Sequence, residues 1–325
     1  MGSKIIGLGM FAPPKILTNE DLERIVETND AWITERTGIK ERHIAECGTP
    51  NSDVALQAAR RALADAKVDP ADLDMVVVGT CTPDMPLPST GCFLQMKLGA
   101  TRAFAVDLNA ACSGFLYSLS TADALIRAGR GKKALVLGSE ILSSVTDYTD
   151  RATCILFGDG AGAVVLSECS DGEGVLSCHL HSDGNLWELI HAPGGGTLHP
   201  YSPEMAEKWV HAIKMAGNET FKQAVTRLVE VSREALESNG LSVSDVDLFV
   251  PHQANQRIIS AVGKRLGIPD EKVFVNLSRY GNTSAASIPI ALAEARAQGR
   301  LKKGDLVLLA AFGAGLTWGS VLLRI

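Results

Sequence analysis

Cys112 is the residue of this chain whose position best suits chemistry. It follows a strand-like run containing Val106 and Leu108, and a helical pattern with apolar residues three and four apart begins at Phe115. The thiol is therefore expected at or near a helix N-terminus, where free backbone N–H groups and the helix dipole favour the thiolate. The pattern predicts a nucleophilic cysteine. The alternative is an inert packing residue, because free Cys is among the most buried residue types.

The other cysteines do not suggest a disulfide framework or a zinc site. The chain has seven cysteines, an odd number, at irregular spacings and without a C-x-x-C pair. They are Cys47, Cys81, Cys92, Cys112, Cys154, Cys169 and Cys178. A role for Cys112 thus depends on partners elsewhere in the chain.

His252 and Asn282 are the expected partners of Cys112. His252 follows an apolar run at 248–250, and Asn282 follows a second expected strand at 273–275 and precedes a helical pattern at 288–292. In layered α/β folds the ends of such strands meet at one ligand site. A His and an Asn can both donate hydrogen bonds to one developing oxyanion, which suits an enolate. Taken alone, His252 could be a structural histidine and Asn282 a turn residue after Gly281.

The elements that position these residues are repeated along the chain. Three pairs of similar segments occur in the same order, namely 62–77 with 235–250, 104–108 with 274–277, and 156–162 with 311–315. Nearly continuous apolar strands at 75–78, 134–137 and 306–309 suit sheets that are covered on both faces. We therefore expect a layered α/β fold made of two similar halves, residues 1–170 and 171–325.

Composition and charge narrow the possible functions. The 325 residues are 46% hydrophobic and 21% charged, with a net charge of −6, which is typical of a globular protein and offers no extended basic field for nucleic acid. The first ten residues resemble a strand more than a signal peptide, and the apolar run at 306–316 is too short to cross a membrane. A cytoplasmic location is expected. Arg257, Lys264 and Arg265 could share one helix face, which is otherwise simply a solvated face.

Several motifs give the sequence a resemblance to a known family. They are Asn109-Ala110-Ala111-Cys112-Ser113-Gly114-Phe115, Pro251-His252-Gln253-Ala254-Asn255, Gly281-Asn282-Thr283-Ser284-Ala285-Ala286-Ser287-Ile288-Pro289, Thr34-Glu35-Arg36-Thr37-Gly38-Ile39 and Phe312-Gly313-Ala314-Gly315-Leu316-Thr317-Trp318-Gly319. From end to end the chain resembles the thiolase-fold condensing enzymes, and among them β-ketoacyl-acyl-carrier-protein synthase III. The resemblance implies a five-layered αβαβα fold built from two duplicated α/β halves.

The resemblance also implies a reaction in two stages. Cys112 would take an acyl group from acyl-CoA, and malonyl-acyl-carrier protein would then lose carbon dioxide while His252 and Asn282 hold the enolate oxygen. The enolate carbon would attack the acyl group and give a 3-oxoacyl carrier protein, the first condensation of dissociated (type II) fatty-acid synthesis. No metal or cofactor is implied, acyl-CoA and malonyl-acyl-carrier protein being substrates. A homodimer is expected.

The family motifs extend to further site residues. Cys112 and Ala314 would form an oxyanion hole for the acyl carbonyl, and Phe312 would lie against the carboxylate that is lost. Leu87 would reach the acyl pocket of the partner subunit. The CoA contacts would be Trp32, Arg36, Thr37, Arg151, Asn218 and Asn255, with the adenine between Trp32 and Arg151. A basic surface of Arg257, Lys222, Lys264 and Arg265 would meet the acidic carrier protein.

Other members of this fold remain as alternatives. A degradative thiolase needs a second cysteine late in the chain, but none follows Cys178, and elongating condensing enzymes carry a second histidine where this chain has Asn282. A starter enzyme of a polyketide or other secondary-metabolite pathway shares the Cys–His–Asn set, and a homologue that only binds acyl-CoA or carrier protein is a further alternative. The Gly/Pro-rich loop at 191–204 is either a lid or surface variation. The sequence leaves the length and branching of the acyl primer open.

Overall fold

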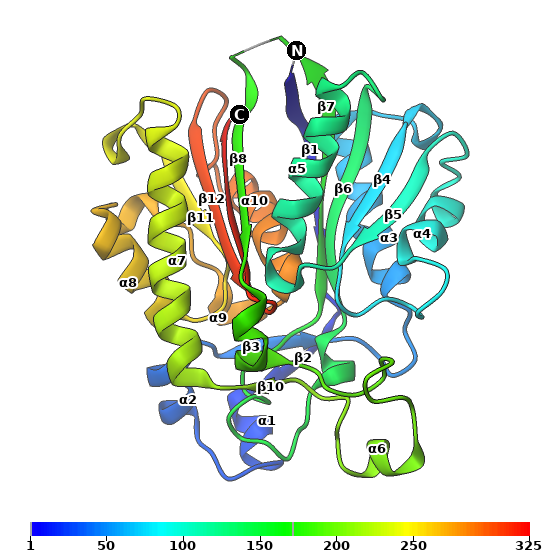
Figure 1. Cartoon of the computed structure of the whole chain (residues 1–325), viewed down its shortest axis with the longest axis vertical. Coiled ribbons are helices and arrows are strands. Elements are labelled where there is room, and N and C mark those ends of the chain that lie inside the picture. Colours follow the sequence, from blue (N-terminus) through cyan, green and yellow to red (C-terminus); the bar gives the residue numbers. More distant parts are fainter. Residues whose placement is uncertain (1, 171) are drawn as a thin grey trace.

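The computed structural model describes residues 2–170 and 172–325, and for residue 206 the backbone alone. Two sheets stand side by side, with helices between them and on both outer faces (Figure 1). Strands of the first sheet come from residues before position 171, and strands of the second come from residues after it. The Met75–Gly79 and Leu306–Gly313 strands are buried at every residue, as expected for strands covered on both faces.

The first sheet has five strands in the order β1-β7-β6-β4-β5. Strand β7 runs antiparallel to both β1 and β6, whereas β4 runs parallel to β6 and β5. The bounds are β1 (Gly2–Phe11), β4 (Met75–Gly79), β5 (Phe104–Leu108), β6 (Lys133–Glu140) and β7 (Gly160–Cys169).

The second sheet has four strands in the order β11-β12-β13-β8. Strand β13 runs antiparallel to β8 and β12, and β11 runs parallel to β12. This pattern repeats that of the first sheet when β8, β13, β12 and β11 take the places of β1, β7, β6 and β4. The bounds are β8 (Gly174–Ser182), β11 (Leu248–Pro251), β12 (Leu306–Gly313) and β13 (Thr317–Arg324).

The prediction of a strand at 273–275 is wrong. At the position that β5 occupies in the first sheet, the second sheet has only an isolated parallel bridge between Phe249 and Val273, and the Phe274 N–H donates to the Phe249 carbonyl. The chain then leaves the sheet, because the Asn276 N–H donates to the Gln253 side chain and a short helix, α9 (Leu277–Tyr280), follows. The segment still delivers Asn282 to the sheet edge.

Three hydrophobic clusters hold the layers together. The helices α5 (Gly114–Arg127) and α10 (Ser287–Ala297) lie between the sheets and share one cluster with strands of both. The helices α3 (Asn51–Ala66) and α4 (Thr90–Leu98) cover the outer face of the first sheet. The helices α7 (Gly217–Glu237) and α8 (Gln256–Leu266) cover the outer face of the second. The order is therefore helix, sheet, helix, sheet, helix.

A cap of smaller elements lies below the layered body in Figure 1. It contains two antiparallel strand pairs, β2 (Lys15–Thr18) with β3 (Glu41–Ile44) and β9 (Ile190–His191) with β10 (Lys214–Met215). Its helices are α1 (Asn19–Glu23), α2 (Asp30–Thr37) and α6 (Pro203–Glu207). Leu22, Ile33 and Leu277 are among the buried residues that join cap and body. The 3-10 turns are η1 (Pro70–Asp72), η2 (Ala111–Ser113), η3 (Leu142–Val145), η4 (Gly184–Leu189), η5 (Val243–Asp245), η6 (Asp270–Lys272) and η7 (Ser284–Ala286).

None of the helices in the described part of the chain is long and apolar enough to span a membrane. The cytoplasmic location stays a prediction.

Candidate active site

Cys112, His252 and Asn282 line a single cavity of about 720 Å³. The cavity lies between the cap, the first turns of α7 and α8, and the ends of the strands. Phe312 lines it as well, and so do all six residues expected to contact CoA, namely Trp32, Arg36, Thr37, Arg151, Asn218 and Asn255. Residues from seven separate segments thus meet at one place.

Cys112 lies in the turn η2, directly before α5, as the sequence predicted. Its neighbour Ala111 has a φ of 46°, a left-handed conformation that L-residues rarely adopt. The end of β12 approaches closely, because a Cβ on Gly313 would lie 2.7 Å from the Cys112 backbone nitrogen. Only glycine at 313 permits this approach.

The expectation that Cys112 would rest as a thiolate is not met. Burial raises the pKa of Cys112 to about 11, the Ser284 hydroxyl works against this, and the Glu140 carboxylate raises the pKa further. The effect of desolvation on the Cys112 pKa therefore outweighs the opposite effect of the helix N-terminus. Cys112 is a neutral thiol at neutral pH and needs a proton acceptor when it reacts.

His252 follows β11 and is only 4% exposed. Its Nδ1 lies 2.6 Å from the Ser287 hydroxyl, and that hydroxyl oxygen accepts a hydrogen bond from the Gln253 N–H at 3.3 Å. Among the described residues, Nδ1 is the hydrogen-bond acceptor within reach of the Ser287 hydroxyl hydrogen, and we therefore assign the ring proton to Nε2. Burial lowers the pKa of His252 to about 4, so the ring is neutral and Nε2–H is a donor.

Asn282 is held by its backbone and by its side chain. Its N–H donates to the Leu156 carbonyl at 2.8 Å, and its own carbonyl accepts from Gly158 at 3.0 Å. The side-chain Oδ1 accepts the Ser284 N–H at 2.8 Å. With Oδ1 engaged in this way, the Nδ2 group is the part of the amide available to a ligand.

The turn between β12 and β13 holds Ala314 near Cys112. The Thr317 hydroxyl lies 2.8 Å from the Ala110 carbonyl oxygen and 3.0 Å from that of Ala314. Among the described residues, neither the Cys112 nor the Ala314 backbone N–H donates to another residue in the turns, and the Cys112 N–H lies beside its own sulfur. Phe312, the residue before Gly313, is 5% exposed.

At the outer end of the cavity two arginines lie over one indole ring. The Arg36 and Arg151 guanidinium carbons are 4.7 and 4.9 Å from the centre of the Trp32 ring. Thr37 is buried and its hydroxyl donates to the Ile33 carbonyl. Asn255 caps α8 by accepting the Arg257 N–H, and its Nδ2 donates to the Arg36 carbonyl. The polar side chains of Thr37 and Asn255, both expected to contact CoA, are therefore already hydrogen-bonded within the protein.

The basic residues expected at one surface divide into two groups. Arg257 and Lys222 line the mouth of the cavity, where Lys222 pairs with Glu219 at 2.8 Å. Lys264 and Arg265 are exposed in the last turn of α8, away from the cavity lining. Leu87 does not line the cavity either, and its side chain is 84% exposed.

Sequence reasoning missed three polar residues of the site. Ser287 and Ser284 lie beside His252 and Cys112, and Glu140 ends β6 with no exposed surface. A charge at the end of an apolar strand was the available signal for Glu140.

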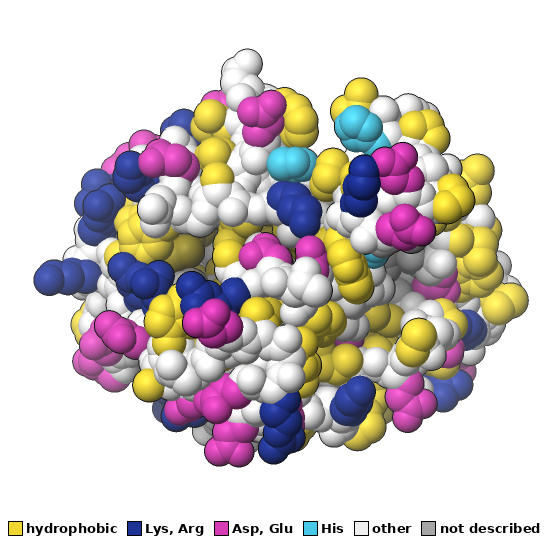
Figure 2. Space-filling model, turned by 90° about the horizontal axis from the view of Figure 1, so that it is seen from below, with side chains coloured by type: hydrophobic (Ala, Val, Ile, Leu, Met, Phe, Trp, Pro, Cys, Tyr) yellow, Lys and Arg dark blue, Asp and Glu magenta, His cyan; other side chains and the backbone are white. Residues whose placement is uncertain are grey.

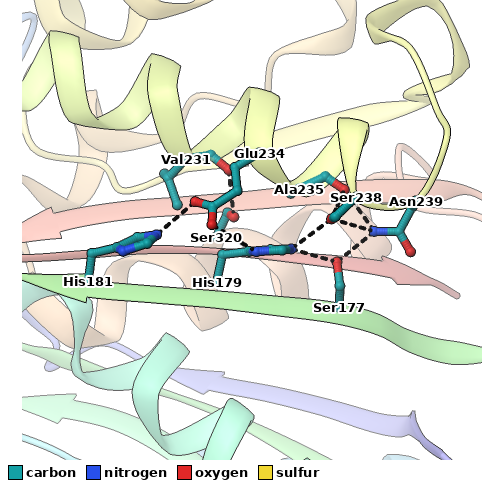
Figure 3. Close-up of polar contacts among 9 residues, drawn as sticks. All are labelled: Ser177, His179, His181, Val231, Glu234, Ala235, Ser238, Asn239 and Ser320. Atoms are coloured by element: carbon teal, nitrogen blue, oxygen red, sulfur yellow. Dashed lines mark hydrogen bonds and ion pairs between the residues drawn. The ribbon is translucent and has the colours of Figure 1, made fainter.

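Two histidines without a predicted role lie outside the site. His179 and His181 bind Glu234 on the outer face of the second sheet (Figure 3). They connect β8 to α7.

Comparisons with known proteins agree with this geometry. Two models for 3-oxoacyl-[acyl-carrier-protein (ACP)] synthase III match residues 106–184 and, for its C-terminal part, 236–325. The chain is 53% identical to β-ketoacyl-[acyl-carrier-protein] synthase III of Desulfitobacterium hafniense, over 98% of this chain and 97% of that protein.

Solved structures match over the whole chain. The crystal structure of 3-oxoacyl-[acyl-carrier-protein] synthase III from Aquifex aeolicus has a TM-score of 0.93 and 49% identity, with all of both chains covered. The priming β-ketosynthase of the R1128 polyketide pathway has a TM-score of 0.91 and 37% identity, covering 99% of this chain and 96% of that one. The predicted thiolase-like fold is confirmed, and the chain belongs to the β-ketoacyl-[acyl-carrier-protein] synthase III family of condensing acyltransferases.

Proposed function

We propose that Cys112, His252 and Asn282 carry out the initiating condensation of fatty-acid synthesis in this chain. The observation that carries the proposal is their meeting in one cavity whose outer end holds Trp32 and two arginines. Acyl-CoA and malonyl-acyl-carrier protein are the substrates that the family implies.

In the first half-reaction the Cys112 sulfur attacks the thioester of acyl-CoA. The acyl oxygen becomes negatively charged as the tetrahedral intermediate forms. The N–H groups of Cys112 and Ala314, neither of which donates to another residue in the turns, support their role as the oxyanion hole, since preorganised backbone donors stabilise such charge. The CoA thiolate then leaves, and the acyl group remains on Cys112.

In the second half-reaction malonyl-acyl-carrier protein loses carbon dioxide. The His252 Nε2–H and the Asn282 Nδ2–H donate to the thioester oxygen as the enolate forms. Because His252 is neutral, it donates a hydrogen bond without delivering a full positive charge. Phe312 gives the departing carboxylate an apolar wall, which favours neutral carbon dioxide. The enolate carbon attacks the acyl group on Cys112.

The CoA nucleotide binds at the mouth of the cavity. Arg36 and Arg151 both lie over the Trp32 ring at less than 5 Å, so an adenine that stacks on a face occupied by one of them displaces that guanidinium group. A planar cation is suited to stack on the outer face of the base once it has moved. Arg151 is the better candidate, since it is exposed and its only polar contact among the described residues is the Glu27 carbonyl.

The carrier protein docks around the same mouth. Figure 2 shows Lys and Arg side chains grouped around a hydrophobic hollow on the face that lies below the body in Figure 1. Arg257 and Lys222 are exposed at the cavity mouth. Their positions support a contact with an acidic partner that delivers its acyl arm into the cavity. Lys264 and Arg265 lie in the last turn of α8, away from the cavity mouth, and are not part of this contact.

A homodimer brings Leu87 of the partner subunit into the acyl pocket. Strand β5 is an edge of its sheet, and apolar side chains around it are exposed. They are Met85, Leu87, Met96 and Phe104. Edge strands with apolar neighbours favour pairing with another chain. Phe104→Asp should halve the mass measured by light scattering, and a monomeric wild-type protein would refute this assembly.

The central assignments are tested by separating the two half-reactions. Cys112→Ser should form no acyl-enzyme, as read by intact-protein mass spectrometry after incubation with acyl-CoA. His252→Ala and Asn282→Ala should still acylate but lose carbon dioxide release from malonyl-acyl-carrier protein. A stable acyl adduct on Cys112→Ser, or normal decarboxylation by the other two variants, would contradict the assignments.

A primer screen identifies the acyl group that this chain accepts. Acyl-CoAs of graded length and branching are offered together with malonyl-acyl-carrier protein, and the products are identified by mass spectrometry. Short fatty acyl primers giving 3-oxoacyl carrier proteins support the fatty-acid role. Products that require unusual starters would instead place the chain with the polyketide priming enzymes.

A further inference from the structure

Cys112 needs a proton acceptor that the residues of the proposed mechanism do not provide. The buried sulfur rests as a thiol, so its proton must leave when the acyl–sulfur bond forms. His252 cannot take it, because Nδ1 receives the Ser287 hydroxyl and Nε2 already carries the ring proton. The amide of Asn282 is not a base. The acceptor must therefore lie on another side of the sulfur.

Glu140 is a buried carboxylate on that other side. It ends β6 and has no exposed surface. Its Oε2 accepts the Thr82 hydroxyl at 2.6 Å, the Cys81 N–H at 3.1 Å and the Thr80 hydroxyl at 3.2 Å. No Lys, Arg or His of the described residues forms an ion pair with it. A carboxylate held by neutral donors and lacking a cation can gain a proton without breaking a salt bridge.

Ser284 begins the turn η7, which packs against both η2, the turn that holds Cys112, and β6, the strand that ends at Glu140. The Ser284 hydroxyl lowers the pKa of Cys112 and of Glu140. It lowers the pKa of the neighbouring Cys81 thiol as well. The hydroxyl oxygen is fully buried, yet it has no well-formed hydrogen bond among the described residues. Such an orphan hydroxyl is uncommon in a folded protein and requires a reason. A φ of 48° places Ser284 in the left-handed region, a strained conformation that the surrounding structure must maintain.

The packing of the turn η7 against β6 fixes this arrangement. A Cβ on Gly138 would lie 2.0 Å from the Ala285 carbonyl oxygen, so glycine at 138 is needed for the turn to come this close. Gly138 is two residues before Glu140 on the same strand, and Ala285 directly follows Ser284. The approach of the two elements thus brings the hydroxyl to the carboxylate.

We propose that Ser284 and Glu140 form a proton relay for Cys112. The proposal rests on Cys112 being the nucleophile. As the sulfur bonds to the acyl carbon, its proton passes to the Ser284 oxygen while the Ser284 hydrogen passes to Glu140. The carbon–sulfur bond of acyl-CoA breaks, and the CoA thiolate leaves and is protonated by water. Glu140 then holds one proton for as long as Cys112 carries the acyl group.

The same proton is returned in the second half-reaction. The enolate carbon bonds to the acyl carbon, the bond to Cys112 breaks, and the departing sulfur recovers its proton from Glu140 through Ser284. Between the two steps the carboxyl group is neutral. A buried negative charge beside the acyl-enzyme would repel both malonate and enolate, and the stored proton removes that charge when the anionic substrate is present.

The first test removes the connecting hydroxyl. Ser284→Ala keeps the backbone N–H that orients Asn282 and deletes only an oxygen without a well-formed partner, so the fold should persist. Acylation of Cys112 by acyl-CoA should fall by about 100-fold, the effect of losing a proton-transfer group. Carbon dioxide release from malonyl-acyl-carrier protein in the absence of acyl-CoA, when no proton has been passed to Glu140 in either enzyme, should match the wild-type enzyme. Ser232→Ala, which deletes another buried unpartnered hydroxyl, in α7, is the matched control and should acylate normally.

The second test separates a relay from simple electrostatic repulsion. Glu140→Gln removes a negative charge near the sulfur, which lowers the Cys112 pKa and should speed alkylation by iodoacetamide at neutral pH. The relay predicts that acylation by acyl-CoA slows at the same time. The titratable groups that face the carboxylate are the Cys81 and Cys112 thiols, so alkylation is followed at Cys112 by peptide mass spectrometry.

Two results would overturn the relay. One is acylation that rises together with alkylation in Glu140→Gln, and the other is acylation at the wild-type rate in folded Ser284→Ala. Either leaves the proposed function intact as long as the wild-type enzyme forms its acyl adduct on Cys112. Absence of that adduct would instead refute the proposed function itself.

Discussion

The Ser287 hydroxyl decides which nitrogen of His252 carries the proton. The Ser287 oxygen lies 2.6 Å from His252 Nδ1. Both residues are buried, since Ser287 is 2% exposed and His252 is 4% exposed. Ser287→Ala removes this hydroxyl and leaves Nδ1 without its partner. The ring can then also adopt the tautomer with the proton on Nδ1, in which Nε2 presents a lone pair to the enolate oxygen instead of a hydrogen.

The expected loss follows from the burial. Leaving a buried polar group without its hydrogen bond costs about 1–3 kcal/mol. If that free energy is lost from the arrangement that stabilises the enolate, decarboxylation slows by a factor of roughly 5 to 150. Acylation of Cys112 should change little, because the His252 ring is not the acceptor of its proton. The His252→Ala variant sets the lower limit for decarboxylation.

The assay compares the two half-reactions in one preparation. Carbon dioxide release from malonyl-acyl-carrier protein and acyl transfer from acyl-CoA are measured for the wild-type enzyme and Ser287→Ala. Nitrogen-15 NMR of the imidazole reports the tautomer directly and should show Nε2–H in the wild-type enzyme. Decarboxylation at the wild-type rate, or equal losses in both half-reactions, would refute the reasoning. Wild-type His252 protonated on Nδ1 would refute it as well.

Three further perturbations test the packing, the docking surface and the charge of the site. Gly138→Ala should lower the free energy of unfolding by about 3 kcal/mol, because the added Cβ would collide with backbone atoms. Urea denaturation measures this change, and Gly184→Ala, at a position with open space around it, is the control and should be nearly neutral. Arg257→Glu should reduce kcat/KM for malonyl-acyl-carrier protein roughly tenfold and spare acylation by CoA, with equal losses disproving a carrier-specific contact. As pH falls from 6.5 to about 4 the unfolded chain takes up a proton that folded His252 refuses, so His252 contributes a loss of stability of roughly 3 kcal/mol over that interval. This slope should be weaker in His252→Asn.

The sequence predicted the three central residues for a physical reason. Cys112, His252 and Asn282 each lie within a few residues of the start of a helix and follow a segment that enters a sheet. Duplication of the halves implies that the ends of these segments converge. Continuous apolar runs indicated the strands β4, β6 and β12, because such runs are buried on both faces. These are local patterns with a direct structural meaning.

Features that depend on several segments at once could not be predicted. The expected strand at 273–275 has suitable residues, but the Gln253 side chain donates to the Phe274 carbonyl and accepts from the Asn276 N–H, and these two hydrogen bonds take the chain out of the sheet. The resting state of Cys112 depends on how much protein surrounds it, which no local pattern reports. Glu140 and Ser284 are far apart in sequence, and their roles appear only where η7 meets β6.

The two halves contain the same kind of turn with different side chains. Ala111 N–H donates to the Asn109 side chain at 3.2 Å, and Ser284 N–H donates to the Asn282 side chain at 2.8 Å. Ala111 and Ser284 are both left-handed, with φ of 46° and 48°, and each begins a 3-10 turn that leads into a helix between the sheets.

Equivalent positions in the two turns carry different side chains. The position after the left-handed residue is Cys112 in the first half and Ala285 in the second, whereas the left-handed residue itself is Ala111 in the first half and Ser284 in the second. The thiol therefore comes from one copy and the hydroxyl beside it from the other. Since the backbone of both turns is the same, exchange of side chains changes the chemistry with little change in fold. We expect that restoring the repeat with Ser284→Ala removes proton transfer while leaving the turn intact.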